Sequence, residues 1–233
     1  MPVLPGNPPL EIVLRRSGSA RRFSLRVSRL DGRVTLSLPA RAREADAMAF
    51  ARTQESWLRQ TLASLPGADL VGIGSILPVE GRMLTILPGA GRAPRVEGTT
   101  LLVPGDGAQV GARTAAFLKV IARERLTRAS DFHARQLGLS YSRITLRDTR
   151  SRWGSCSADR ALMYSWRLIM APPAVLDYVA AHEVAHLAEM NHSPAFWAVV
   201  TRLCPGWQAH RNWLREHGQG LHGYRFDASA SED

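Results

Sequence analysis

The chain has 233 residues, of which 45% are hydrophobic, and its formal net charge is +10 at pH 7. These values are typical of a globular protein with one sizeable domain or two small ones, and no apolar run approaches the roughly 20 residues of a membrane-spanning helix. The two cysteines, Cys156 and Cys204, are too few for a disulfide framework, and the proline-containing start does not resemble a secretory signal. We therefore expect a cytoplasmic protein.

The N-terminal part is predicted to be rich in strands. Residues 11 to 38 alternate apolar and polar side chains, as half-buried strands do. Asp31-Gly32 separates two such runs, and it predicts a hairpin because both residues tolerate positive φ. A helix is expected from Glu44 to Leu65, where Pro66-Gly67 ends it. Further short strands are expected at Ile76 to Val79, Met83 to Leu87 and Leu101 to Val103.

Beyond a glycine-rich stretch at 105–111 the pattern becomes mainly helical. The helix that Pro172-Pro173 opens is apolar nearly all round, which indicates that it is buried. The other expected elements are a helix over 112–137 ended by Gly138, strands over Tyr141 to Leu146 and Ala161 to Leu168, and helices over 194–203 and 207–217.

These patterns predict an α+β protein. We expect a β-rich part with one helix over residues 1–108, a second domain over 109–218 and a disordered tail over 219–233. We further expect the N-terminal strands to pack onto the second domain.

The segment His182-Glu183-Val184-Ala185-His186 carries the chemistry. Helix positions four apart lie on one face, so the two imidazoles can bind one Zn²⁺. Glu183 can then take a proton from a water on the metal, whose pKa zinc lowers towards about 7. The alternative is a pair of buried core histidines, and leaving such polar groups unpaired would cost about 2–7 kcal/mol each.

A catalytic zinc site needs a third protein ligand, for which His192 is the best candidate. Glu189 lies on the same helix face but more than about 10 Å along it from His182, too far to share one ion. His192 can turn back to the metal if the helix ends before it. Asn191 suits the left-handed position after a helix, and Ser193-Pro194 suits the start of the next one.

The third ligand has two alternatives. A glutamate from the next helix is disfavoured because residues 194–215 contain no acidic residue. Cys156 stays open, since a thiolate binds zinc well. A His-His-Cys site would resemble peptide deformylases, and the protein would then be a non-proteolytic zinc amidohydrolase.

The second half of the chain resembles the YgjP-like metallopeptidase family and, more remotely, the SprT-like and Wss-like zinc proteases. The similarity is most specific over residues 150–213 and extends weakly to the N-terminal part. The matching segments are Arg152-Trp153-Gly154-Ser155-Cys156-Ser157, Trp166-Arg167-Leu168, His182 to His186, Met190 to Pro194, Phe196-Trp197, Ser19-Ala20-Arg21-Arg22 and Gly32-Arg33-Val34.

This resemblance implies a zincin-like core with His182, His186 and His192 as ligands, Glu183 as general base, and a protein or peptide substrate. In zincins an extended substrate pairs with an edge strand above the metal, and the strand over 161–168 is the natural candidate.

The roles of several other residues follow less directly. We expect Gly154 to form a tight turn, pinned by Trp153 in the core, and Ser155 and Cys156 are candidates to approach the metal. Tyr164 and Tyr178 are candidates to stabilise an oxyanion. Four aromatic residues at helical intervals are expected in the core: Phe196, Trp197, Trp207 and Trp213.

The basic charge leaves open a nucleic-acid partner, as an addition to proteolysis or as a binding function of its own. Lys119 is the sole lysine, so the arginine content can equally reflect genomic base composition. The arginines are densest near the N-terminus, at Arg15, Arg16, Arg21, Arg22, Arg26, Arg29 and Arg33.

Overall fold

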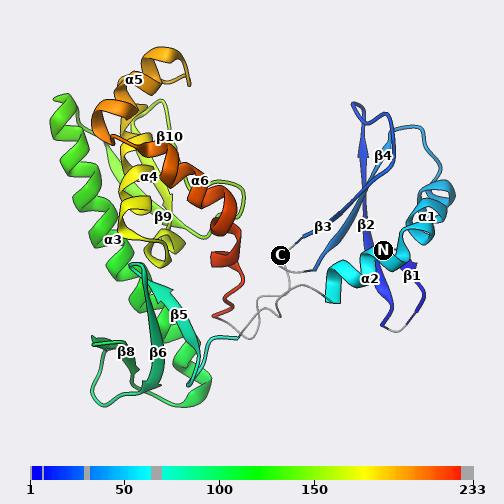
Figure 1. The fold of residues 1–233 in the computed structure, drawn as a ribbon, viewed down its shortest axis with the longest axis horizontal. Helices are drawn as coiled ribbons and strands as arrows, with labels where there is room; N and C mark the ends of the chain where they lie inside the picture. Colours follow the sequence, from blue (N-terminus) through cyan, green and yellow to red (C-terminus); the bar gives the residue numbers. More distant parts are fainter. Residues whose placement is uncertain (1, 7, 29–31, 64–69, 227–233) are drawn as a thin grey trace. The chain divides into compact units, whose positions relative to one another are not determined.

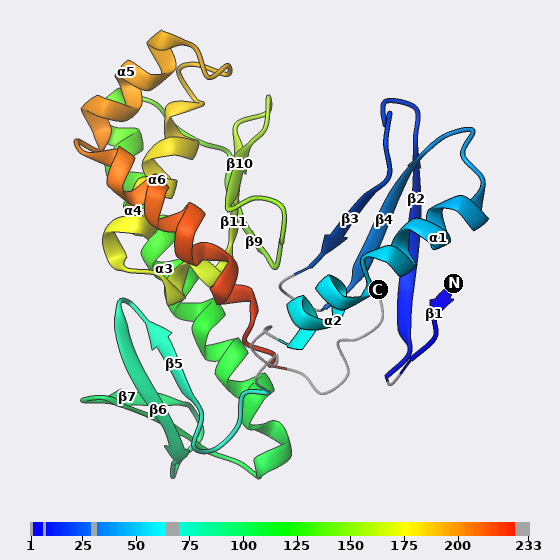
Figure 2. The same ribbon diagram turned by 45° about the vertical axis from the view of Figure 1, so that its right-hand side comes forward.

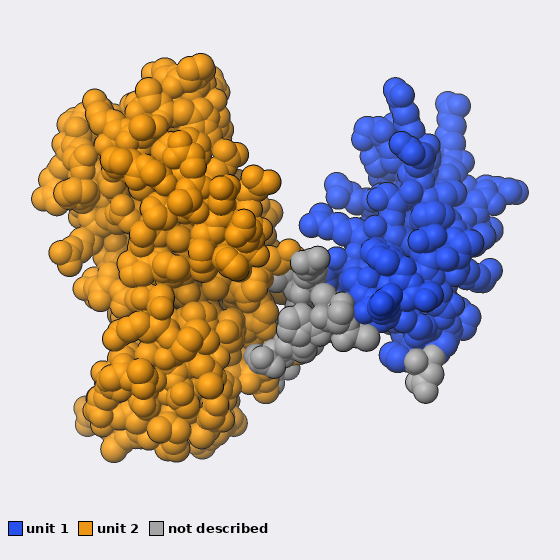
Figure 3. Space-filling model, viewed as in Figure 1, with its two compact units in different colours: residues 1–69 blue, residues 70–233 orange. Residues whose placement is uncertain are grey.

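The computed structural model describes residues 2–6, 8–28, 32–63 and 70–226 (Figure 1). The chain divides into two compact units, unit 1 over residues 1–69 and unit 2 over residues 70–233 (Figure 3). Each unit has its own buried apolar core. Strands and helices occur in both units, so the predicted α+β class is confirmed. In the described part of the chain, no helix has the length and apolarity needed to cross a bilayer.

Unit 1 is built on a four-stranded sheet with the order β1-β2-β4-β3. The antiparallel pairing of β3 with β4 confirms the predicted hairpin, and the backbone N–H of Ser28 donates to the carbonyl of Arg33 at 2.9 Å. Asp31 of the proposed turn lies outside the described residues. The strands are β1 (Val3–Leu4), β2 (Leu10–Ser17), β3 (Ser24–Val27) and β4 (Val34–Pro39).

Two helices, α1 (Glu44–Thr53) and α2 (Glu55–Ala63), follow the sheet, so the prediction of one helix was wrong. The hydroxyl of Thr53 donates to the carbonyl of Phe50 at 2.7 Å. Gln54 then leaves the helical conformation, with φ of −104° and ψ of 9°. Residues from both helices and from alternate positions of the strands form the core of unit 1: Leu4, Leu10, Ile12, Val34, Leu36, Leu38, Ala47, Met48, Ala51 and Leu58.

Unit 2 begins with a second four-stranded sheet, of order β5-β6-β8-β7. Its inward side chains, such as Leu84 and Leu101, share one core with the helices that follow. The chain therefore divides at 69/70, whereas the sequence suggested a boundary at 108/109. Strand β7 was not predicted, because its side chains are mostly exposed and its sequence shows little alternation of apolar and polar residues. The strands are β5 (Ile76–Val79), β6 (Arg82–Pro88), β7 (Arg95–Glu97) and β8 (Thr100–Val103).

The long helix α3 (Val110–Leu137) follows a short 3₁₀ turn, η1 (Gly107–Gln109), and joins the parts of unit 2. The β5–β8 sheet lies beside its first half, and α4 packs against α3 farther along, with α5 and α6 packed on α4 (Figures 1 and 2). As predicted, α3 ends at Gly138, which takes the left-handed conformation with φ of 66°.

A three-stranded sheet of order β10-β11-β9 lies next to α3 in unit 2. It consists of β9 (Arg143–Arg147), β10 (Gly154–Cys156) and β11 (Ala161–Ser165). The strand predicted to reach residue 168 ends at Ser165, and a buried 3₁₀ turn, η2 (Trp166–Met170), follows. An apolar run of this kind does not by itself distinguish a strand from a buried turn.

Two further expectations about this sheet were wrong. Strand β11 is central, paired with β10 on one side and β9 on the other, so its backbone is not free to pair with a substrate. Gly154 lies in the edge strand β10 and not in a tight turn.

Helices α4 (Pro173–Ala185), α5 (Pro194–Leu203) and α6 (Trp207–His217) complete unit 2. Helix α4 contacts α3, α5, α6 and β10, which confirms its predicted burial. Residues 219–226, which were expected to belong to a disordered tail, are ordered. The 3₁₀ turn η3 (Gly218–His222) follows α6, and Leu221 and Phe226 are buried in the core. Residues 227–233 lie outside the described part.

Candidate metal centre

Two of the three predicted ligands lie at the end of α4. His182 is in the last turn and His186 is the residue that caps the helix, with ring centroids 5.2 Å apart. The helix ends at Ala185, earlier than the sequence suggested. Just after it, the backbone N–H of Leu187 donates to the carbonyl of Val184, and that of Ala188 donates to the carbonyl of Ala185. These tightened bonds satisfy the last carbonyls, so Asn191 does not take the predicted left-handed conformation.

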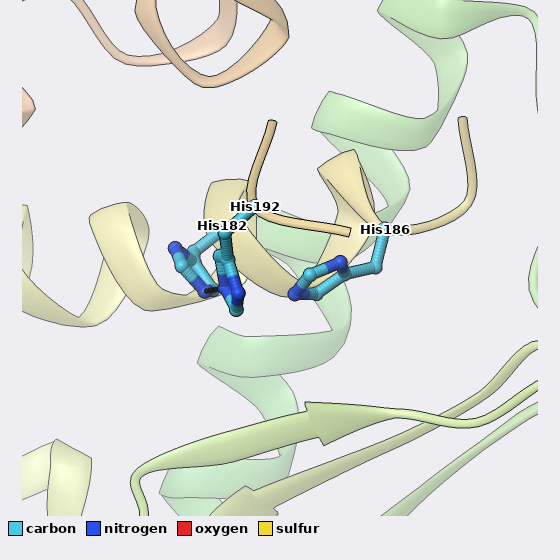
Figure 4. Close-up of side chains that lie close together, drawn as sticks. All are labelled: His182, His186 and His192. Carbon is cyan, nitrogen blue, oxygen red and sulfur yellow. Dashed lines mark hydrogen bonds between the residues drawn. The ribbon is translucent and has the colours of Figure 1, made fainter. Parts of the chain in front are cut away.

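The turn between α4 and α5 brings His192 back towards His182. The hydroxyl of Ser193 accepts a hydrogen bond from the N–H of Phe196 at 3.3 Å, and Pro194 is the first residue of α5, as predicted. Nε2 of His192 lies 3.1 Å from Nε2 of His182. One ligand-capable nitrogen from each of the three histidines lies within 4.8 Å of the others (Figure 4).

The protonation states of His182 and His186 suit a metal ion. Burial, with the neighbouring histidines, lowers the pKa of His182 to about 3, and burial also lowers the pKa of His186. Neutral imidazole is the form that binds zinc. Nδ1 of His186 donates to the carbonyl of Glu189 at 3.0 Å, which leaves Nε2 with a free lone pair. The donor set therefore fits a divalent metal such as zinc.

Aromatic side chains hold the imidazoles in place. Phe196 is fully buried and stacks on His186 with centroids 4.4 Å apart. Trp197 stacks on Trp207 at 4.3 Å and lies edge-on to His182 at 5.7 Å. The expected core role of the aromatic residues is confirmed: Phe196 and Trp207 are buried, and Trp197 and Trp213 pack partly buried against the core.

Glu183 follows His182 in α4 and is 5% exposed. Burial raises the pKa of its carboxyl group to about 8, although the charge of Arg152 opposes this shift. The backbone of Gly154 lies directly against this side chain, since a Cβ at residue 154 would be 2.6 Å from Cγ and Oε1 of Glu183. The Trp-Gly-Ser-Cys motif thus contributes a glycine that makes room for the carboxylate, a role that the sequence did not reveal.

The other residues that the sequence suggested for the site are Tyr164, Tyr178 and Cys156. Tyr164 is fully buried with its hydroxyl 3.0 Å from that of Ser130, so it does not face an open site. Tyr178 packs edge-on to His182 with centroids 6.0 Å apart, and burial raises the pKa of its hydroxyl to about 12. Cys156 is not in the group of possible metal ligands among the described residues. Burial and the charge of Glu183 raise the pKa of its thiol, which disfavours a thiolate.

Arg167, in the motif Trp166-Arg167-Leu168, has a structural role. Its guanidinium donates two hydrogen bonds to Asp148, at 2.7 and 3.0 Å, and two more to the carbonyls of Leu221 and Tyr224. Burial alone would raise the pKa of Asp148, but the bonds and charge of Arg167 lower it overall. Arg167 therefore fixes the segment after α6 to the core.

Three convergent imidazoles on an α+β fold could hold a metal ion, and a buried glutamate follows the first of them in the chain. The family described as "YgjP-like, metallopeptidase domain" matches residues 21–217. The chain belongs to this family of metallopeptidases, as its motifs predicted.

Other comparisons add little to this assignment. A search of curated proteins finds no match. Among solved structures, the metallopeptidase zymogen abylysin of Pyrococcus abyssi is similar over 40% of this chain and 93% of its own, with 19% identity and a TM-score of 0.36. No feature of this chain is inferred from so distant a similarity.

Proposed function

We propose that the protein is a zinc-dependent metallopeptidase of zincin type, with His182, His186 and His192 as metal ligands and Glu183 as general base. The observation that carries the proposal is the convergence of three imidazole nitrogens within 4.8 Å next to a buried carboxyl group. Three histidines leave one position of a tetrahedral zinc site open for water or substrate.

The chemistry divides between metal and protein. When bound, zinc would lower the pKa of water towards about 7 and polarise the peptide carbonyl. A carboxylate oxygen of Glu183 accepts the proton of the attacking water and delivers it to the leaving amine. Burial raises the pKa of this carboxyl group, which makes its carboxylate form a better proton acceptor. The aromatic neighbours pack against the imidazoles, of which His186 is buried and His192 is exposed.

Strand β10 replaces β11 as the strand that we propose pairs with an extended substrate. It is an edge of its sheet, and its Gly154 backbone adjoins Glu183. Ser155 is opposite Met163 in β11. The backbone N–H of Ser165 donates to the carbonyl of Trp153, and that of Ser157 donates to the carbonyl of Ala161, so residues 153, 155 and 157 are the ones that face β11. By the alternation of an antiparallel pair, Gly154 and Cys156 then direct their backbone N–H and C=O groups away from β11.

The two other functions suggested by the sequence receive less support. A deformylase-type site requires Cys156 as a ligand, and its thiol lies outside the histidine group among the described residues. For a nucleic-acid partner, Arg16 is already used inside unit 1, where it donates to the carbonyls of Ala40 and Ala42. Arg15 and Arg26 are exposed, and Arg29 lies outside the described residues, so nucleic-acid binding stays a prediction from the sequence.

The Glu183→Gln variant tests the proposal. We expect casein cleavage by the zinc-loaded protein to fall at least about 100-fold, because proton transfer is lost, while the zinc content measured by mass spectrometry stays at one per chain. Glu216→Gln, on the exposed face of α6, is the matched control and should cleave normally. Cleavage that is unchanged in Glu183→Gln, or a wild-type protein that binds no zinc, would contradict the proposal.

A further inference from the structure

A groove on unit 2 lies away from the histidine cluster, between α3 and the start of α4. It has a volume of about 480 Å³, and the side chains of Arg128, Phe132, Arg135 and Leu176 are among those that line it. Asp177 of the lining is about 140° around the helix axis from His182 and about 180° from His186, at 3.6 residues per turn. The groove therefore opens on the opposite side of α4 from the metal ligands.

One wall of the groove is apolar and accessible. Phe132 exposes 53% of its surface, an unusual state for a phenylalanine on a helix that is otherwise packed against a core. Ala129, Ile169 and Leu176 continue the same wall. The volume is in the range of small-molecule sites, roughly 300–1,000 Å³. A ligand of moderate size with an apolar body would cover Phe132.

The charges of the groove are not balanced. Arg125 is paired with Glu80 at 2.6 Å and with Glu124 at 2.8 Å. The carboxylate of Asp177 lies 3.0 Å from Nε2 of His133 and offsets one of the two remaining cationic charges, those of Arg128 and Arg135. Within the described ranges, no carboxylate ion-pairs with Arg128 or Arg135, and both are exposed; Nε of Arg135 donates to the backbone carbonyl of Asp131 at 3.1 Å.

The geometry of α3 places these two cations on either side of the exposed ring. Positions 128, 132 and 135 are spaced four and three residues apart, so they lie along one face of the helix. A guanidinium group is suited to two parallel hydrogen bonds with a carboxylate or similar oxyanion. The face thus presents an apolar surface flanked by two anion-binding groups.

We propose that this groove binds a small amphipathic organic anion, whose apolar body covers Phe132 and Leu176 and whose acidic group pairs with Arg128 or Arg135. The site is separate from the metal centre and does not depend on the peptidase reaction. It would give the enzyme a second ligand site, in contact with the first turns of the helix that ends in the metal ligands.

The probe is 1-anilinonaphthalene-8-sulfonate, a fluorescent aryl sulfonate, titrated into the full-length zinc-loaded protein. We expect saturable binding of one dye per chain. The Arg128→Gln/Arg135→Gln variant should weaken binding at least about tenfold, because the charge-assisted hydrogen bonds are lost. Phe132→Ser should weaken it as well. All three side chains are exposed, so circular dichroism should show an unchanged fold.

Arg123→Gln is the matched control, since Arg123 is an exposed arginine of α3 that does not line the groove. It should leave the dye affinity unchanged. Dye binding that is insensitive to the double variant, or that depends on Arg123 instead, would overturn the proposal.

A competition experiment identifies the class of ligand. Decanoate should displace the dye, and decanol, which has the same alkyl chain without the charge, should do so at least about tenfold less well. Equal displacement by the two would show that the arginines do not select an anion. Displacement by an acidic aromatic peptide at concentrations where decanoate has no effect would assign the groove to a protein partner and overturn the small-molecule proposal.

Discussion

Gly154 determines where the carboxyl group of Glu183 can lie. A Cβ added at residue 154 would lie 2.6 Å from Cγ as well as from Oε1, so the buried side chain cannot avoid a methyl group by rotating its end alone. We expect Gly154→Ala to lower the rate of casein cleavage at least about tenfold, because the proton-accepting oxygen is displaced. Zinc binding should be retained.

The matched control for this substitution is Gly107→Ala. Gly107 has no atom within 4 Å of an added Cβ and no positive φ, so its variant should keep full activity. Normal cleavage by Gly154→Ala would show that Glu183 does not need its observed position.

His222 links the stability of unit 2 to pH. Burial, together with the charge of Arg167, lowers its pKa to about 4, and its ring packs on Trp153 with centroids 5.1 Å apart. The unfolded chain, with a histidine pKa near 6.5, binds the proton more readily. The stability present above pH 6.5 is therefore lost as the pH falls towards 4, by up to about 3 kcal/mol for this group.

The His222→Asn variant should show a smaller decrease of unfolding free energy between pH 7 and pH 4 than the wild type. The measurement is urea denaturation of the zinc-free proteins at each pH, so that metal release does not contribute. The pKa of His182 is also lowered, so part of the pH dependence of stability should persist in the His222→Asn variant. An unchanged pH dependence would contradict the buried neutral state of His222.

Cys156, whose backbone N–H points away from β11, provides the test of substrate pairing by β10. A proline at Cys156 would remove a backbone N–H that points away from β11, while an edge strand otherwise tolerates proline. We expect Cys156→Pro to cleave casein at least about tenfold more slowly and to retain zinc. Cys156→Ser, which changes the side chain but keeps the N–H, should cleave normally. Equal activity of both variants would remove β10 as the substrate strand.

At the level of elements, the sequence predicted helices better than strand topology. Helices α5 and α6 begin and end as expected because Ser193, Pro194 and Pro205-Gly206 are local signals. The order β10-β11-β9 could not be predicted, since pairing depends on residues distant in sequence. The break at Gln54 was likewise not predicted, since neither glycine nor proline marks it in the sequence.

For the molecule as a whole, the sequence identified the histidines that converge but not the boundary between units. His182, His186 and His192 share one short segment, so local rules sufficed to bring them together. The boundary could not be found in the same way. The strands at 76–103 resemble those of unit 1 in composition, yet they bury their side chains in the core of unit 2. Only tertiary packing distinguishes the two sheets.

Zinc K-edge X-ray absorption of the full-length, zinc-loaded protein tests the central claim most directly. Three imidazole nitrogens and one oxygen should surround the metal at about 2.0–2.1 Å, with the outer-shell scattering of three histidine rings. His192→Ala should lose one of these rings, and Cys156→Ser should change nothing. A sulfur scatterer at about 2.3 Å in the wild-type spectrum would contradict the three-histidine site.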